Sequence, residues 1–209
     1  GGRSVYGDQA MIWTESNEHI QALVYQLPKE GKTVCGDSFY FNATDGGMIC
    51  ALADGLGSGQ MARESSSAIS DIVKAYSDED VASLMERCNQ ALKQKRGATV
   101  SILKADFKTR TIVYSSVGNI RFILYAPSDK YIYPLPVTGY LSGKPQTYKT
   151  YTYPYEKGSR FIIHSDGLSV PSLRTYLKNH FTPEDISNQI EAYTKLGNDD
   201  LTYIIGQLF

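Results

Sequence analysis

The chain has 209 residues, of which 42% are hydrophobic and 21% charged, and its formal net charge at pH 7 is −1. This length and composition predict one sizeable globular domain. The nearly neutral charge excludes a general attraction to nucleic acid or to an anionic membrane. The sequence contains neither an apolar run of bilayer length nor a signal-peptide pattern.

The first ten residues, GGRSVYGDQA, are small and polar and precede Met11. We interpret residues 1–10 as an expression-tag remnant, with a disordered natural tail as the alternative, and we expect a single domain over residues 11–209. The three cysteines, Cys35, Cys50 and Cys88, form neither a disulfide framework nor a zinc-binding pattern. We therefore expect a cytoplasmic protein with reduced thiols, each serving as a small core residue.

The predicted elements form blocks along the chain. Alternating apolar and β-branched residues predict strands, at residues 20–27, 33–41, 48–54, 97–106, 111–118, 120–126, 159–167 and 201–208. Apolar stripes at helical spacing, and an N-cap threonine followed by proline, predict helices, at residues 60–76, 79–94 and 183–193. Short turns join most of the strands, so the sheets should be largely antiparallel. This order of elements predicts a layered α+β fold.

Four aspartates lie in or beside predicted strands: Asp54 and Asp166 each close one, Asp37 lies inside one and Asp199 opens one. Asp37 lies in CGDSF, Asp54 in ADGLGSG, Asp166 in HSDGL and Asp199 in NDDLT. A single Asp-Gly pair is best interpreted as a turn, as in TDGG at 44–47. Four such carboxylates together would repel one another, and a divalent cation removes that repulsion. The pattern therefore favours a site for Mg²⁺ or Mn²⁺, which prefer oxygen ligands.

The glycines after Asp54 fit the same interpretation. Gly55, without a side chain, can turn its carbonyl toward a metal and leave room for a substrate. Gly57 and Gly59 let the loop pass close to the site before the helix that begins near Gln60. The positive end of that helix would favour an anion.

The motifs GDSFYF, ALADGLGSG, IIHSDGL and DDLTYIIG, in this order, resemble those of the metal-dependent protein phosphatases of the 2C class. The resemblance is closer to the bacterial branch that includes SpoIIE and RsbU, and it extends from about Ile20 to the end of the chain. Segments such as SVGNIRFILY and PLPVTGYLSGKPQ resemble the small free-standing stressosome phosphatases of that branch. The resemblance implies a four-layer αββα sandwich of two mainly antiparallel sheets flanked by helices.

The resemblance also implies a catalytic site. Asp54 would bridge two Mn²⁺ or Mg²⁺ ions that activate a water. Asp37 and the Gly55 carbonyl would complete one side, and Asp166 and Asp199 the other. Asp200 is the alternative to Asp199, and side-chain alternation favours Asp199.

Several roles stay open at this stage. Eukaryotic members of the class carry a histidine, a candidate general acid, where this chain has Leu56. His164 is either a group behind the metal ligands or a hydrogen-bonded core histidine, and we favour the core. The candidates for an arginine that binds phosphate are Arg63, Arg96 and Arg121, each with a solvated surface role as the default.

The implied substrates are phosphoserine and phosphothreonine on phosphorylated STAS-domain proteins of the stressosome, similar to RsbS and RsbR. The implied role is negative regulation of the general stress sigma factor pathway, with no nucleic-acid or membrane partner. The alternative is a non-catalytic module of the same fold that binds metal and phosphoproteins. A nucleotide-binding loop is disfavoured, because GLGSGQ and EGKT lack glycines of the known phosphate-binding patterns. The tyrosines of residues 131–155 are best explained by strand packing, although residues 137–146, with Tyr140 and Lys144, could contact a protein substrate.

Overall fold

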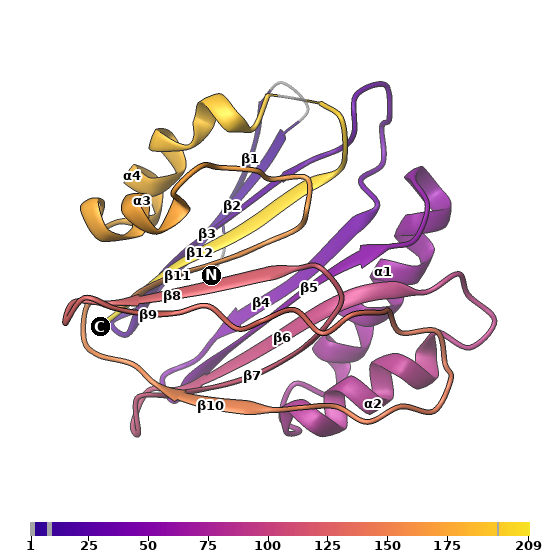
Figure 1. Ribbon diagram of the computed structural model, residues 1–209, viewed down its shortest axis with the longest axis horizontal. Helices are drawn as coiled ribbons and strands as arrows, with labels where there is room; N and C mark the ends of the chain where they lie inside the picture. The colour runs from indigo at the N-terminus through magenta and orange to yellow at the C-terminus, as the bar shows by residue number, and fades with distance from the viewer. Residues whose placement is uncertain (1–2, 8–9, 196) are drawn as a thin grey trace.

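The computed structural model describes residues 3–7, 10–195 and 197–209. Two antiparallel sheets face each other, and helices cover the outer face of each (Figure 1). The seven-stranded sheet contains, in spatial order, β1 (Arg3–Gly7), β2 (Ala10–Ser16), β3 (Ile20–Leu27), β12 (Leu201–Leu208), β11 (Arg160–His164), β8 (Arg121–Ala126) and β9 (Lys130–Ile132). The five-stranded sheet contains β10 (Tyr151–Pro154), β7 (Thr111–Val117), β6 (Ala98–Asp106), β5 (Gly47–Gly55) and β4 (Asp37–Ala43).

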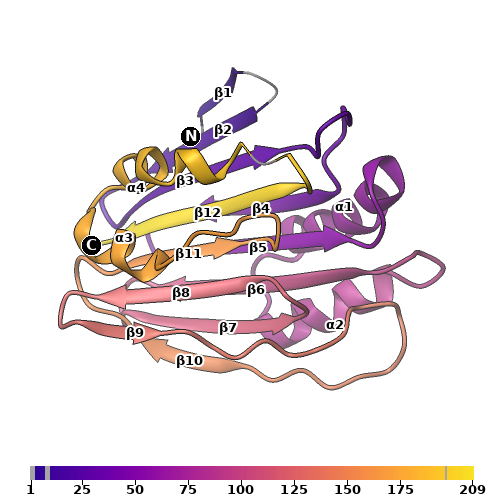
Figure 2. The ribbon, with the colours of Figure 1, turned by 45° about the horizontal axis from the view of Figure 1, so that its top comes forward.

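The helices are divided between the two outer faces (Figure 2). They are α1 (Gly59–Ala75), α2 (Val81–Ala91), α3 (Leu173–Asn179) and α4 (Pro183–Gln189), followed by the 3₁₀ turn η1 (Glu191–Tyr193). α1 and α2 pack on the five-stranded sheet, while α3 and α4 pack on the seven-stranded sheet. Within the part of the chain that the structure describes, no helix is both long and apolar enough to cross a bilayer.

Side-chain alternation along the strands builds three apolar layers. On β8, Phe122 faces the other sheet and joins the core between the sheets, whereas Ile123 faces outward and packs with α3 and α4. On β6, Leu103 joins the core between the sheets and Ile102 packs with α1 and α2. The result is the helix–sheet–sheet–helix sandwich that the sequence predicts.

Some elements differ from the sequence prediction. No strand was expected before Ile20, but β1 and β2 extend the edge of the seven-stranded sheet. Residues 33–36 lie outside β4, so Cys35 is a buried loop residue rather than a strand residue. α3 was missed because seven residues after Pro171 carry too few turns to show a periodic apolar stripe. The helix predicted over 183–193 ends at Gln189 and continues as η1.

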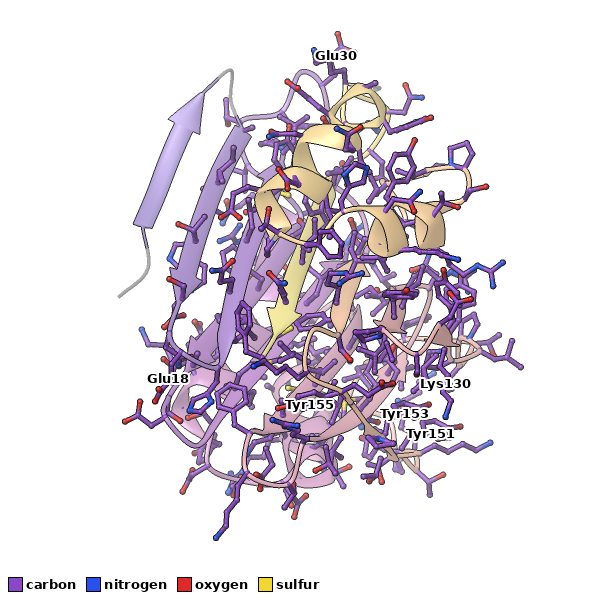
Figure 3. All side chains as sticks on the ribbon, turned by 90° about the vertical axis from the view of Figure 1, so that its left-hand side faces the viewer. Glu18, Glu30, Lys130, Tyr151, Tyr153 and Tyr155 are labelled. Atoms are coloured by element: carbon purple, nitrogen blue, oxygen red, sulfur yellow. The ribbon has the colours of Figure 1, made fainter. Side chains whose placement is uncertain are left out.

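Figure 3 shows the end of the sandwich near Lys130, with Tyr151, Tyr153 and Tyr155. Tyr151 and Tyr153 stack on β10 with ring centroids 6.1 Å apart. Tyr155 is buried and packs in the core between the sheets. Strand packing therefore explains Tyr151 and Tyr153, as the alternation predicts, whereas Tyr155 lies one residue beyond β10.

Candidate active site

Four strand termini meet at the end of the sandwich opposite the β8–β9 hairpin (Figure 1). β4 begins at Asp37, and β5 ends at Gly55, directly after Asp54. β11 ends two residues before Asp166, and β12 begins directly after Asp200. Because neighbouring strands are antiparallel, the start of one and the end of the next lie at the same edge. The fold thus brings acidic residues from both sheets to one end of the molecule.

Asp37 is the most deeply buried of these acidic residues. It lies opposite Asp54 in the β4–β5 ladder, and the Thr202 hydroxyl donates a hydrogen bond to its Oδ2 at 2.8 Å. Its Oδ1 is buried and has no hydrogen-bond partner among the described residues. Burial raises the pKa of the Asp37 carboxyl, and the nearby charge of Asp200 raises it further.

Asp54 occupies the central position of the cluster. Burial raises the pKa of its carboxyl, and the negative charges of Asp37, Asp166 and Asp199 each raise it further. Asp54 therefore interacts with Asp37 on its own sheet and with Asp166 and Asp199 beside the seven-stranded sheet.

Asp166 and Asp199 form the solvent-exposed half of the cluster. The Asn119 side-chain amide donates to Asp166 Oδ2 at 2.8 Å. Partial burial raises the pKa of Asp199, and the charge of Asp166 raises it further, so the two carboxyl groups lie close together. Both residues thus present oxygens near the mouth of the site.

Asp200 is arranged differently from its neighbour Asp199. Its side chain is 3% exposed, and its Oδ1 accepts a hydrogen bond from the Lys29 backbone amide at 2.8 Å. Its Oδ2 lies so close to Gly36 that a Cβ there would be 2.6 Å away. The two carboxylates therefore have different partners, in agreement with the alternation used above, while the choice of metal ligand stays a prediction.

The residues present fit a divalent cation. Asp37 has a buried oxygen without a partner, and the carboxyl groups of the cluster repel one another. Both conditions are unfavourable in the protein alone and are relieved by a bound cation. Among the residues that the structure describes, no three His, Cys, Asp or Glu side chains already surround a single point.

The Asp-Gly pairs of this chain fall into two structural classes. A Cβ on Gly55 would lie 1.8 Å from the Ala62 carbonyl oxygen of α1, and a Cβ on Gly167 would lie 2.1 Å from the Asp200 carbonyl oxygen. A Cβ on Gly46 would meet nothing within 4 Å. The pairs at 54–55 and 166–167 are therefore sites of close backbone packing, and the pair at 45–46 is a turn, as predicted.

The three candidate arginines lie in different places. Arg63 Nη1 donates to the backbone carbonyl of Asp37 at 3.1 Å, so this guanidinium ties α1 to the start of β4. Arg96 is exposed, and its Nη1 lies 3.3 Å from where a Cβ on Gly57 would be. Arg121 belongs to the other sheet, where it lies opposite His164. The structure does not gather the three into one phosphate-binding cluster.

His164 is buried, and its Nδ1 lies 2.8 Å from the Ser165 carbonyl oxygen, to which it donates a hydrogen bond. Burial lowers the pKa of its ring, and the positive charge of Arg121 also lowers it. The imidazole is therefore neutral near pH 7, and its burial and backbone hydrogen bond are those expected of a core histidine.

Sequence reasoning missed the polar side chains that hold the acidic cluster in place. The Gln26 side-chain amide donates both to the Asp37 carbonyl at 3.1 Å and to the Thr202 hydroxyl at 3.2 Å. Asn119 holds Asp166 from the turn before β8. Thr202 lies inside the DDLT motif and could have been noticed there, but nothing in the sequence around Gln26 or Asn119 indicates these contacts.

Residues 137–146 also reach this end of the sandwich. Leu141 forms an isolated antiparallel bridge with Ala98, the residue that pairs with Gly55 in the β5–β6 ladder. Tyr140 is 47% exposed and lies beside Gly97. The position suits a contact with a large substrate, and that role stays a prediction.

Comparison with known proteins agrees with this fold and site. Residues 44–205 match the family described as Stage II sporulation protein E (SpoIIE). The chain therefore belongs to the SpoIIE family, and it is an enzyme of the phosphatase class.

Individual relatives narrow the comparison. The chain is 63% identical over 198 residues to the phosphoserine phosphatase RsbX of Bacillus subtilis (strain 168), which covers 95% of this chain and 100% of that protein. A crystal structure of RsbX in complex with magnesium has 62% identity and a TM-score of 0.94, covering 95% of this chain and 100% of that one. A chain from a structure described as "The bacterial stressosome: a modular system that has been adapted to control secondary messenger signaling" has 25% identity and a TM-score of 0.81, covering 90% of this chain and 100% of that one.

Proposed function

We propose that this protein is a metal-dependent serine/threonine phosphoprotein phosphatase whose reacting centre is the acidic cluster. The observation that carries the proposal is the buried Oδ1 of Asp37, which has no hydrogen-bond partner among the described residues. Beside it lies the carboxyl group of Asp54, which also interacts with the carboxyl groups of Asp166 and Asp199. An arrangement of this kind is unfavourable unless a cation binds there. The magnesium in the related RsbX crystal structure supports the same conclusion.

The proposed ligands are the acidic residues that the fold brings together. Mg²⁺ or Mn²⁺ would be held by the carboxylates of Asp37, Asp54, Asp166 and Asp199 and by the Gly55 carbonyl, with Asp54 as the ligand shared between the two sides. Bound Mg²⁺ or Mn²⁺ supplies Lewis acidity, which lowers the pKa of water and offsets negative charge on a phosphoryl group.

The remaining residues of the site have positioning roles. Thr202 and Gln26 hold Asp37, and Asn119 holds Asp166. No cysteine acts as the nucleophile, because Cys35, Cys50 and Cys88 are buried and burial raises the pKa of each thiol. Leu56 offers no proton to the leaving alkoxide, so that proton comes from solvent or from a group outside this position.

The proposed substrates are phosphoserine and phosphothreonine on STAS-domain proteins of the stressosome, in the cytoplasm, and the proposed role is negative regulation of the general stress sigma factor pathway. Support comes from the 63% identity to RsbX and from the similarity to a chain of a stressosome structure. The three buried free cysteines are consistent with a reducing compartment.

The first experiment separates the enzyme from a non-catalytic binding module. Phosphate release from a phosphoserine peptide is measured with Mn²⁺, with Mg²⁺ and with a chelator. Because Asp54 is central to the cluster, we expect Asp54→Asn to lower kcat by at least about 100-fold, which is ~2.7 kcal/mol at the transition state. Asp45→Asn, at the Asp-Gly pair of the open turn, is the matched control and should retain activity. A wild-type protein that binds Mn²⁺ but releases no phosphate would establish the binding module instead.

The second experiment tests the substrate class. Phosphorylated STAS-domain proteins and a generic phosphopeptide are offered side by side, with p-nitrophenyl phosphate as a small reference. We expect selective, metal-dependent release from the STAS-domain proteins. Replacing Tyr140 and Lys144 by alanine should reduce that release more than hydrolysis of the small reference. Equal rates on the STAS-domain proteins and the generic phosphopeptide would support a metal-dependent phosphatase without a preference for STAS-domain substrates.

A further inference from the structure

A cavity of 650 Å³ lies on the outer face of the seven-stranded sheet, beside the acidic cluster. It is bounded by the ends of β8 and β11 and by the segment that runs from β11 into α3. Its polar lining consists of Arg121, Tyr133, His164, Ser169, Ser172 and Arg174. β11 ends at His164, two residues before Asp166, so the cavity begins where the acidic cluster ends.

The cavity is positively charged. Two arginines line it, and no aspartate or glutamate does. Within the described residues, neither Arg121 nor Arg174 forms a salt bridge. Three hydroxyl groups, those of Tyr133, Ser169 and Ser172, accompany the guanidinium groups and can donate hydrogen bonds to an anion.

The positions of both arginines are defined by the fold. Arg121 lies opposite His164 in the β8–β11 ladder, and it shares the outer face of β8 with Ile123. Arg174 lies over the Tyr131 ring, with its guanidinium carbon 5.2 Å from the ring centroid. Stacking on an aromatic ring restrains a guanidinium group without using its N–H donors, which stay free for a ligand.

The acidic cluster and this cavity would act on different parts of one substrate. The phosphoryl group that reacts binds at the cluster, where the cation offsets the repulsion from the carboxylates. A second anionic group on the same substrate would be repelled by Asp166 and Asp199, unless positive charge were provided beyond them. Arg121 and Arg174 provide that charge on the side of the sheet that faces away from Asp54.

We propose that this cavity, with Arg121 and Arg174 as its anion-binding groups, is a subsite for a second anionic group of the phosphoprotein substrate, either a carboxylate or another phosphate. The proposal rests on the proposed phosphatase function, which it extends to substrate selection. Guanidinium groups bind both carboxylate and phosphate in a bidentate manner, so the two sources share one recognition chemistry.

The experiment compares three phosphoserine peptides that differ only in their flanking residues. One has neutral flanks, one carries glutamates near the phosphoserine, and one carries a second phosphoserine. We expect the wild-type kcat/KM to be at least about 10-fold higher for either anionic peptide than for the neutral one, and mainly through KM, because each tenfold preference corresponds to ~1.4 kcal/mol of binding. The two anionic peptides together show whether carboxylate, phosphate or both are accepted.

The variants assign the preference to the cavity. Arg121→Gln and Arg174→Gln should each reduce the ratio of kcat/KM between anionic and neutral peptides, and the double variant should bring the ratio near one. Arg174→Lys should reduce the ratio less than Arg174→Gln does, because lysine keeps the positive charge but lacks the planar guanidinium that binds an anion with two N–H groups. Arg110→Gln, in the exposed β6–β7 turn of the five-stranded sheet, at the end opposite the acidic cluster, is the matched control and should keep the wild-type ratio.

Binding without turnover separates this proposal from the proposed function. Affinity for the unphosphorylated glutamate peptide is measured by calorimetry in the presence of a chelator, for wild type and for the double arginine variant. Binding that disappears in the double variant supports the subsite, even if no phosphatase activity is found. A wild-type enzyme that hydrolyses all three peptides equally, or a preference that survives in the double variant, would overturn the subsite and leave the phosphatase assignment intact.

Discussion

The two carboxylate oxygens of Asp37 have different surroundings. Oδ2 accepts a hydrogen bond from Thr202, and Oδ1 is buried without a partner among the described residues. A buried carboxylate with one oxygen satisfied and one oxygen free is oriented for a ligand but unstable without it. At the scale of single residues, the site is therefore defined as much by the groups that orient the carboxylates as by the carboxylates themselves.

Thr202→Val tests this orientation, because it removes the hydroxyl and keeps the shape of the side chain. Asp37 Oδ2 and the Gln26 amide both lose a partner. We expect the free energy of unfolding of the metal-free protein to fall by about 1–3 kcal/mol, and the Mn²⁺ concentration for half-maximal activity to rise. Urea denaturation and a metal titration measure the two effects. Thr150→Val, at an exposed loop residue, should change neither; an unchanged metal requirement in Thr202→Val would contradict the positioning role.

The raised pKa values predict how stability depends on pH. Burial and neighbouring carboxylates raise the pKa of Asp37 from 3.8 to about 7 and that of Asp54 from 3.8 to about 9. Between the ordinary pKa of 3.8 and these raised values, the folded state binds more protons than the unfolded state. The free energy of unfolding therefore falls as pH rises through this range. With a chelator present, we expect the thermal midpoint to decrease steadily from pH 5 to pH 8.

The control for this pH effect is the same measurement with saturating Mn²⁺. The metal requires deprotonated carboxylates, so the decrease should become smaller or reverse. Asp54→Asn removes one of the two titrating groups and should flatten the metal-free profile. A metal-free wild-type protein that gains stability between pH 5 and pH 8 would show that these carboxyl groups are not perturbed as described.

At the scale of elements, the close approach of α1 to β5 places the helix beside the acidic cluster. The Ala62 carbonyl of α1 lies so close to Gly55 that any side chain on Gly55 would overlap it. Arg63, the next residue of α1, reaches back to the Asp37 carbonyl at the start of β4. The first turn of α1 is thus connected to both strands that carry the buried carboxyl groups.

Gly55→Ala should separate α1 from β5. The added methyl group would lie 1.8 Å from a backbone oxygen, which no rotamer change can relieve. We expect a loss of about 3 kcal/mol or more in the free energy of unfolding, together with loss of activity. Gly46→Ala, at the turn where a Cβ meets nothing within 4 Å, is the matched control. If both variants unfold at the same urea concentration as wild type, the tight contact does not exist in solution.

At the scale of the whole molecule, the acidic cluster joins the two sheets at one end of the sandwich. Asp37 and Asp54 belong to the five-stranded sheet, whereas Asp166 and Asp199 flank strands of the seven-stranded sheet. When the carboxyl groups at this end are ionised and no cation is bound, their mutual repulsion opposes the packing of the sheets. A cation that binds ligands from both sheets would hold that end together.

Metal binding should therefore stabilise the whole fold. For one site at a metal concentration 100 times the dissociation constant, the expected gain in unfolding free energy is ~2.7 kcal/mol. Differential scanning calorimetry with Mn²⁺, with Mg²⁺ and with a chelator measures it as a rise in Tm. Asp54→Asn should lose most of this rise, and Asp45→Asn should keep it. A rise of equal size in Asp54→Asn would place the binding site elsewhere.

Much of this architecture could be predicted from the sequence, because it depends on local patterns. The alternation at 20–27 and 201–208 predicts β3 and β12 with the bounds that the structure has, and the helical stripe at 60–76 predicts α1 to within one residue at each end. The motifs around Asp37, Asp54, Asp166 and Asp199 indicate the candidate site. Short or edge elements such as β2 and α3 were missed, because their residues are partly exposed or too few to form a clear period.

The sequence by itself determined the layered α+β class and the principal strands and helices, and it singled out the acidic residues of the candidate site. Only the tertiary structure decided that Asp200 is held by the Lys29 amide, that Thr202, Gln26 and Asn119 orient the carboxylates, and that Arg121 and Arg174 share a cavity. The physical reason is the range of each interaction. Hydrophobic periodicity depends on residues within a few positions of one another, whereas these contacts join residues that are far apart in the sequence and meet only when the strands and helices have assembled. The contacts of Thr202 and Gln26 with Asp37 form only when the two sheets have packed.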